Sequence, residues 1–370
     1  MDMNPFEDFA FINQQIDDDI NFQENDTSII DEKAREQNPI CELKNLSFKS
    51  LPISMATNKY IQILDISYSD VYSLDNLPPN LTILKSIDNN ISAVSDLPNS
   101  LEVLKLKNNS IRNIDLKKYS NLKIVDISNN PLKTYEFPQS LVALTISSLN
   151  LNINSFNYFD KLQYLNICDS LILGDFILPQ SIIHFVVTNC DISNITFVIP
   201  PNIKKLELIN CNLNKLNFRL TEHLEFLDLS NNKLTEIPIL PDTLINMNIS
   251  NNKLIQIPNI PRNMKILNIK NNPQLTLNEI KIYMIKHHNI NLMCDNSISK
   301  SIGTKEEESD DDMEQFKRLN MFRTHHLRIN SERAKFQDFI ERQRMNIMKN
   351  NDSFRPSSDN KINIRKKITV

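Results

Sequence analysis

Cysteine and histidine are the residues of this 370-residue chain that most often carry nucleophilic or metal chemistry. Neither type shows the spacing of a metal site, and adjacent histidines such as His287 and His288 would point about 100° apart on a helix. The chain has only two glycines, Gly174 and Gly303, which argues against a glycine-rich phosphate loop. We therefore expect no catalytic, cofactor or metal site. The five cysteines are Cys41, Cys168, Cys190, Cys211 and Cys294.

The same pattern of apolar residues occurs eleven times, with steps of 19 to 21 residues between copies. Such a period predicts coils that bury their apolar side only by stacking, with one short parallel strand per coil. The third apolar position of each coil should form an inward-facing column, with Ser86 as its exception. The coils start at Ile61, Leu81, Leu101, Leu122, Leu141, Leu162, Ile182, Ile203, Leu224, Leu244 and Met264.

A column of turn residues follows the strands, and most of them are asparagine. A buried amide can pair with both N–H and C=O groups where the chain turns inward. Ser69 and Ser170 are weaker substitutes, and Leu149 cannot fill this role, so we expect a distorted coil there. Cys190 and Cys211 could form a disulfide one coil apart, but two buried thiols are the favoured interpretation. The predicted turn ladder is Asn89, Asn109, Asn130, Cys190, Cys211, Asn232, Asn252 and Asn272.

A proline signature precedes most strands, as in Leu97-Pro98-Asn99-Ser100-Leu101 and Leu178-Pro179-Gln180-Ser181-Ile182. Because proline lacks an N–H and fixes φ, the back of each coil should be extended, with little helix. Over residues 41–294 the pairing of motifs resembles the short leucine-rich repeats of bacterial effectors of the YopM and IpaH kind, and those of giant DNA viruses. The resemblance implies an α/β repeat fold: a right-handed solenoid with its parallel sheet on the concave face and a mostly extended or irregular convex side. The segment after Cys294 contains no cysteine, so the resemblance does not extend to the ligase activity of IpaH-like proteins.

The segments outside the repeats are oppositely charged. We expect residues 1–40 (net −9) to be an acidic, disordered tail, residues 295–312 an acidic linker, and residues 313–370 (net +8) a basic helical or disordered tail. The basic tail could bind a partner, act as a nucleic-acid arm, or remain solvated. Degenerate coils should cap the solenoid, one around Leu43, Leu46, Phe48 and Leu51, and the other with a helix over residues 278–288 above Leu275 and Leu277.

The variable strand positions point to the concave face and define the candidate interaction surface. Apolar centres flanked by charge are typical of a protein-binding face, although isoleucine and valine also favour strands for local reasons. We expect a non-enzymatic protein-interaction scaffold, with nucleic-acid association through the basic tail as the alternative. The chain has no signal peptide or membrane span in its sequence, which predicts an intracellular location, in cytoplasm or nucleus, or in host cytoplasm if it is viral or an effector. We also expect a monomer. The predicted contact residues are Ile63, Ile83, Lys85, Val103, Lys105, Lys107, Ile124, Tyr164, His184 and Phe226.

Overall fold

The computed structural model describes residues 25–295, except 148–149, 153–155, 175 and 288–289. The N-terminal half contains α1 (Asn25–Lys33), β1 (Ile40–Glu42), the 3-10 helix η1 (Ile53–Thr57), β2 (Ile63–Asp65), β3 (Ile83–Lys85), β4 (Val103–Lys105), β5 (Asn113–Asp115), β6 (Ile124–Asp126), β7 (Thr134–Glu136), β8 (Ala143–Ser147) and β9 (Asn150–Asn152). The C-terminal half contains β10 (Tyr164–Cys168), β11 (Leu171–Leu173), β12 (Phe176–Ile177), β13 (His184–Thr188), β14 (Phe197–Val198), β15 (Lys205–Ile209), β16 (Phe226–Asp228), β17 (Asn246–Asn248), β18 (Ile266–Asn268), α2 (Leu277–Lys286) and β19 (Asn291–Met293).

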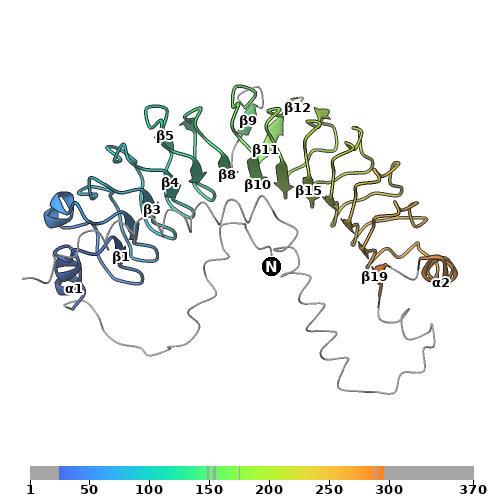
Figure 1. The fold of residues 1–370 in the computed structure, drawn as a ribbon, viewed down its shortest axis with the longest axis horizontal. Coiled ribbons are helices and arrows are strands. Elements are labelled where there is room, and N and C mark those ends of the chain that lie inside the picture. Colours follow the sequence, from blue (N-terminus) through green and yellow to red (C-terminus); the bar gives the residue numbers. More distant parts are fainter. Residues whose placement is uncertain (1–24, 148–149, 153–155, 175, 288–289, 296–370) are drawn as a thin grey trace, which may run out of the picture. The chain divides into compact units, whose positions relative to one another are not determined.

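One parallel sheet of 13 strands runs through the repeat unit in the order β1-β2-β3-β4-β6-β8-β10-β13-β15-β16-β17-β18-β19. Figure 1 shows these strands along the concave side of the stacked coils. Eleven of them belong to the predicted coils, which confirms the period, and β1 and β19 add one strand at each end. Equivalent residues of neighbouring coils are direct partners, as for Ile63 with Ile83 and Ile83 with Val103.

The core consists of residues at the apolar positions of each coil, and Leu64, Leu84 and Leu104 are fully buried. The third apolar position forms the predicted inward column from Ile66 to Ile269. Its exception, Ser86, is also fully buried, and its hydroxyl accepts a hydrogen bond from the Asn89 amide at 2.7 Å. A polar atom is therefore tolerated in this column because the turn ladder supplies its partner.

The proline signature marks a tight turn that leads into the strand. The carbonyl of each proline accepts the N–H three residues later, at the first apolar position, as from Leu101 to Pro98 at 3.0 Å. Proline fixes the turn geometry and has no N–H of its own to satisfy. Where proline is missing, Tyr119 and Thr221 supply the same carbonyl, to Leu122 and Leu224.

The backs of the coils are extended, as the sequence predicts. Three two-stranded parallel sheets form there: β5 with β7, β9 with β11, and β12 with β14. Figure 1 shows β5, β9, β11 and β12 on the side away from the main sheet. In the described residues, helix in a coil back is limited to η1, in the N-terminal cap coil that carries β1.

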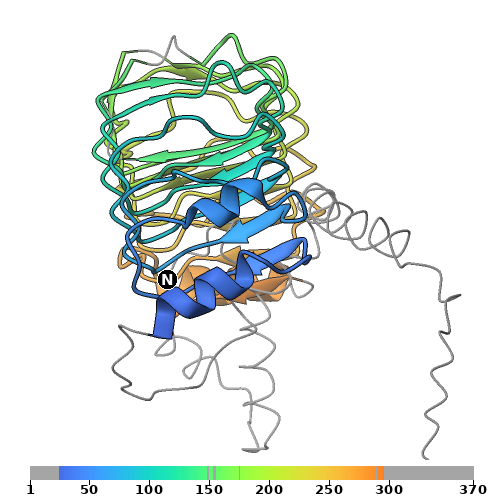
Figure 2. The ribbon, with the colours of Figure 1, turned by 90° about the vertical axis from the view of Figure 1, so that its left-hand side faces the viewer.

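The N-terminal cap begins earlier than the sequence indicates. Residues 25–40 were expected in a disordered tail, yet Ile30 of α1 and Ala34 just after it pack into the core, and the Asn58 amide donates to the Ala34 carbonyl at 3.0 Å. Figure 2 looks onto this end, where α1 and η1 lie against the coils. The prediction fails because the helix carries mostly polar residues, and only these two apolar side chains are buried.

The C-terminal cap agrees with the prediction to within two residues. Thr276 and Glu279 form a reciprocal capping box at the start of α2. Leu275, Ile280 and Tyr283 are buried, but Leu277 is 37% exposed, so its predicted packing under the helix is wrong. The segments 1–24 and 296–370, which include the linker and the basic tail, lie outside the described residues, as does Leu149.

Candidate functional site

The predicted contact residues come together in three adjacent columns of the concave face, with Lys85 and Lys105 in the second and Lys107 in the third. The first runs from Ile63 through Val103, Tyr164 and Phe226 to Ile266, and strand register places each residue beside the next. Its side chains are less accessible than an exposed stripe would be: Ile63 is 7% exposed and Ile124 is 1% exposed. Strands about 4.8 Å apart pack identical positions against each other, which hides the apolar atoms.

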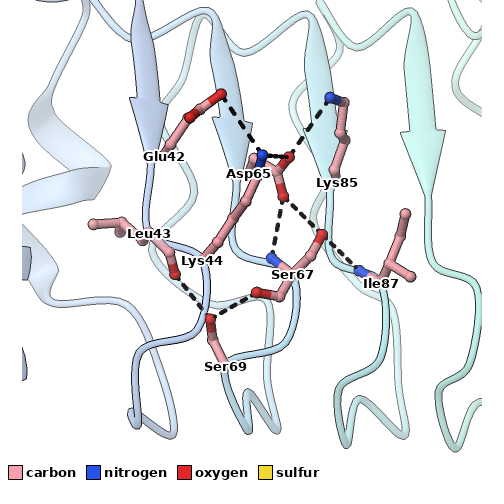
Figure 3. Close-up of polar contacts among 8 residues, drawn as sticks. All are labelled: Glu42, Leu43, Lys44, Asp65, Ser67, Ser69, Lys85 and Ile87. Carbon is pink, nitrogen blue, oxygen red and sulfur yellow. Dashed lines mark hydrogen bonds and ion pairs between the residues drawn. The ribbon is translucent and has the colours of Figure 1, made fainter. Parts of the chain in front are cut away.

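At the N-terminal end of this face, the carboxylate of Asp65 gathers two lysines (Figure 3). Its Oδ2 lies 3.3 Å from Lys44 Nζ and 3.5 Å from Lys85 Nζ. Its Oδ1 accepts hydrogen bonds from the Ser67 hydroxyl at 2.7 Å and from the Ser67 N–H at 3.2 Å. The carboxylate is almost completely buried, whereas the lysine side chains retain 37% and 24% exposure. The cluster therefore presents two lysines to solvent, together with Glu42, whose side chain is 53% exposed and lies 3.8 Å from Lys44 Nζ.

The Asp65 arrangement recurs along the sheet. Asp126 accepts from the hydroxyl and N–H of Ser128, and Asp228 from the N–H of Ser230. Asn248 does the same for Ser250. Burial raises the pKa of Asp126, which the hydrogen bonds from Ser128 and the charges of Lys105 and Lys107 oppose. These carboxylates close the strand ends, and their structural role accounts for them without catalysis.

Towards the C-terminal half, the concave face becomes mixed in charge and aromatic. His184 Nε2 lies 2.7 Å from Glu207 Oε1, and its ring meets Tyr164 edge-on, with ring centroids 4.9 Å apart. Lys205 Nζ lies 5.7 Å from the centre of the Phe226 ring, a cation–π distance. Of the predicted anchors, Tyr164 is partly exposed, while His184 and Phe226 are buried, with 8% and 3% of their surface exposed.

The predicted asparagine ladder pairs the backbone of successive coils. Asn232 Nδ2 donates to the carbonyls of Leu208 and Leu229 at 2.7 and 2.9 Å, and Oδ1 accepts the N–H groups of Cys211 and Leu213. Ser69 substitutes in the first coil, where its hydroxyl donates to the carbonyls of Leu43 and Ser67 (Figure 3). Each ladder residue satisfies groups that burial would otherwise leave unpaired.

Cys190 and Cys211 occupy ladder positions as buried thiols, as favoured from the sequence. Cys211 Sγ donates to the carbonyls of Val187 and Ile209 at 3.4 and 3.3 Å, and Cys190 Sγ to that of Thr188. Burial raises the pKa of Cys190 to about 11 and that of the partly exposed Cys168 to about 12. Thiols with such pKa values are poor nucleophiles at neutral pH.

One functional candidate, Tyr68, is missing from the sequence-based prediction. The residue before each ladder position has a left-handed backbone, and in the other described coils it is Asn or Asp, as in Asn108 (φ 56°) and Asn129 (φ 54°). These amides form a second, exposed ladder, in which Asn129 donates to Asn108 at 2.6 Å. Tyr68 has φ 60° and is 55% exposed. A bulky residue in this region is strained, and the break in the Asn/Asp column was the signal.

Two shallow grooves mark the convex side. The larger, of about 800 Å³, lies around Tyr135 and Tyr158, and the other, of about 660 Å³, between Val198 and Leu216–Thr221. Neither is lined by a cysteine or histidine. In the described residues there is no cluster of three or more His, Cys, Asp or Glu that could hold a metal ion, and no helix long and apolar enough to cross a membrane.

Known structures share this architecture. YopM from Yersinia enterocolitica WA-314 superposes with a TM-score of 0.52 at 24% identity, over 72% of this chain and 62% of that one. The chain has a leucine-rich repeat fold. YopM from Yersinia pestis matches 73% of this chain and 91% of its own, at 22% identity and a TM-score of 0.45. No protein-family model matches the sequence, and a search of curated proteins finds no match either.

This chain combines a proline turn before most strands with asparagine at the two turn positions after the strand, the exposed left-handed position and the buried ladder position. The proline carbonyl fixes the entry into the strand, the buried asparagine fixes the exit, and the exposed Asn or Asp takes the left-handed residue between them. Asparagine tolerates that conformation better than other non-glycine residues. A chain with two glycines therefore builds the tight turns of its described coils with Asn or Asp at this position, apart from Tyr68.

Proposed function

We propose that this protein is a non-enzymatic scaffold that binds a protein partner through the concave face of β2, β3, β4 and β6. The observation that carries the proposal is the group of accessible lysines Lys44, Lys85 and Lys107, which lies beside the apolar column and near carboxylates occupied by strand-end hydrogen bonds. The neighbouring Lys105 is only 6% exposed. Cationic groups around an apolar floor suit a partner surface with acidic and apolar side chains.

Because the apolar column is buried, we propose that the partner contacts the residues beside the column and not its isoleucines. Val103 is 2% exposed, so it shapes the floor and offers little area to a partner. Lys85, Ile87 and Lys107 are partly exposed, and Tyr68 is more than half exposed at the end of the same coil as Asp65. Exposed aromatic residues beside cations are typical hot spots of protein interfaces.

Charge reversal tests this surface. We expect K85E/K107E to reduce the capture of a native partner about tenfold or more, because like charges in an interface cost several kcal/mol. The matched control is K117E/K133E, which changes two exposed lysines beside the convex strands β5 and β7. Partner capture is quantified by mass spectrometry, and circular dichroism checks that each variant is folded. Equal loss in both variants, or in neither, would refute the concave-face proposal.

The alternative function and the location in the cell stay predictions. Nucleic-acid binding would use the basic segment 313–370, which lies outside the described residues. Retention on DNA or RNA at low salt, lost on deletion of that segment, would support it. An intracellular location and a monomeric state also remain predictions.

A further inference from the structure

We infer that the convex side of the repeat unit binds an extended peptide, which adds a strand to the outer edge of β14. The site is the shallow groove of about 660 Å³ between Val198 and Leu216–Thr221. Figure 1 shows β12, the strand that pairs with β14, on the side away from the main sheet, so this site is separate from the concave face. The occupant is an extended segment of another protein, with apolar side chains at alternate positions and one acidic residue.

The small sheet of β12 and β14 ends at this groove. Ile177 and Val198 are direct partners in it, and no strand follows in the back of the next coil, residues 212–223. In this described part of the chain, no backbone hydrogen bond joins Val198 or Ile199 to residues 212–223. An edge strand of this kind is a template for a further strand, which pairs with its N–H and C=O groups.

The groove is lined mostly by apolar side chains. Ile199 is buried on the side of β14, and Leu216, Phe218 and Leu220 are half-buried in the opposite wall, where they pack against the core. The residues between these three are exposed, an alternation typical of a strand, although residues 216–220 form none. Side chains of an extended peptide point to the same side at every second residue, so they match this spacing.

An exposed apolar stripe continues from the groove over the neighbouring strands. Leu171 and Leu173 of β11, Ile177 of β12 and Val198 of β14 are between 50% and 65% exposed. Large apolar side chains gathered on adjacent strands mark an interaction surface. A strand added beside β14 covers Val198 with its outward side chains, while its inward side chains enter the groove.

The charge of the groove selects an acidic peptide. Of the described residues that line it, Arg219 alone is charged, and it is exposed. An arginine pairs with a carboxylate through two parallel hydrogen bonds, so a glutamate or aspartate suits the occupant. A second copy of this chain fits less well, because its own β14 is part of a continuous coil back and cannot enter the groove as a single strand.

Titration of the full chain with a synthetic peptide tests the site. The probe is a capped octapeptide that alternates valine with threonine and carries one glutamate near its centre. Isothermal titration calorimetry measures its Kd, and hydrogen–deuterium exchange with mass spectrometry locates it. We expect saturable binding, with slower exchange in residues 196–199 and 214–221 when the peptide is bound.

A charge exchange at Arg219 identifies the contact. R219E should weaken binding of the glutamate peptide about tenfold or more, and it should strengthen binding of the same peptide with lysine in place of glutamate. The matched control is R262E, which changes an exposed arginine in the turn before β18 and should leave both affinities as in wild type.

A second variant tests the edge of β14. Val198→Asp should weaken binding of the glutamate peptide, because it places a carboxylate where the peptide strand adds. Val198 is 65% exposed, so the variant should fold normally, which circular dichroism checks. K85E/K107E should bind the peptide as wild type does, so this inference and the proposed concave-face function can fail separately.

Several outcomes would overturn the inference. These are no saturable binding at millimolar peptide, slower exchange at strands of the concave sheet instead of the groove, or equal affinities of R219E and R262E. If residues 196–199 and 214–221 of the peptide-free chain exchange more slowly as the protein concentration rises, the occupant is a second copy, which also overturns it.

Discussion

Asn232 Nδ2 donates to the carbonyl oxygen of Leu208, 24 residues earlier, at 2.7 Å. The same amide group also closes its own coil and accepts two N–H groups from the coil before it. One side chain thus joins adjacent coils at a level where neither has access to water.

Asn232→Ala should therefore be strongly destabilising. The substitution leaves buried N–H and C=O groups of Cys211 and Leu208 unpaired, and each such group costs about 1–3 kcal/mol. We expect a loss of about 2–4 kcal/mol in the free energy of unfolding, measured by urea denaturation. The matched control is Asn263→Ala, which removes an exposed bond to the Asp242 carbonyl and should cost under about 0.5 kcal/mol. Similar losses in both variants would show that the buried ladder amide contributes no more to the free energy of unfolding than an exposed amide.

Tyr68→Asn should stabilise the fold. Asparagine occupies the same left-handed position in seven described coils, and relief of the strain should contribute about 1 kcal/mol. Tyr72→Asn, a change at an exposed tyrosine outside the left-handed region, is the control. Thermal or urea unfolding measures both. If Tyr68 is a partner contact as proposed, the stabilised variant should also bind its partner more weakly; a variant less stable than wild type contradicts the strain argument.

Asp228→Asn should change how stability depends on pH. Burial raises the pKa of the Asp228 carboxyl to about 6 from its ordinary value of 3.8, against the hydrogen bonds from Ser230 and Asn248. The folded chain therefore takes up this proton at a higher pH than the unfolded chain, so the group stabilises the fold as pH falls from 6 towards 4 and costs stability at pH 7. Asparagine fits the site, because Asn248 and Asn268 make the same bond to the N–H two residues later.

The measurement compares urea unfolding of Asp228→Asn and wild type between pH 7 and pH 4. The stability of the variant relative to wild type should drop by roughly 1–2 kcal/mol as pH falls through 6. A difference that stays constant over this range would show that the Asp228 carboxyl titrates normally.

The sequence predicted the features that depend on the period and missed those that depend on neighbours. Ile63, Ile83 and Val103 are in the expected register because stacked coils repeat one geometry. Their low exposure was not predictable in this way, because it depends on how tightly the columns pack on the concave side. Tyr68 required knowledge of backbone conformation, and α1 required knowledge of what Ile30 and Ala34 contact.

The amide ladder also gives the stack a direction. Asn272 accepts the N–H of Leu254 and donates to the carbonyl of Ile249, both in the preceding coil, and Asn252 treats Leu234 and Leu229 in the same way. Removing the last coil would strip partners from backbone groups held inside the coil before it. Removing the first would release ladder side chains, which can turn outward to water, in addition to the backbone hydrogen bonds of the sheet that are lost when either end coil is removed. We therefore expect the N-terminal coil to detach more easily than the C-terminal coil. Under an applied force, the two ends should unfold at different forces.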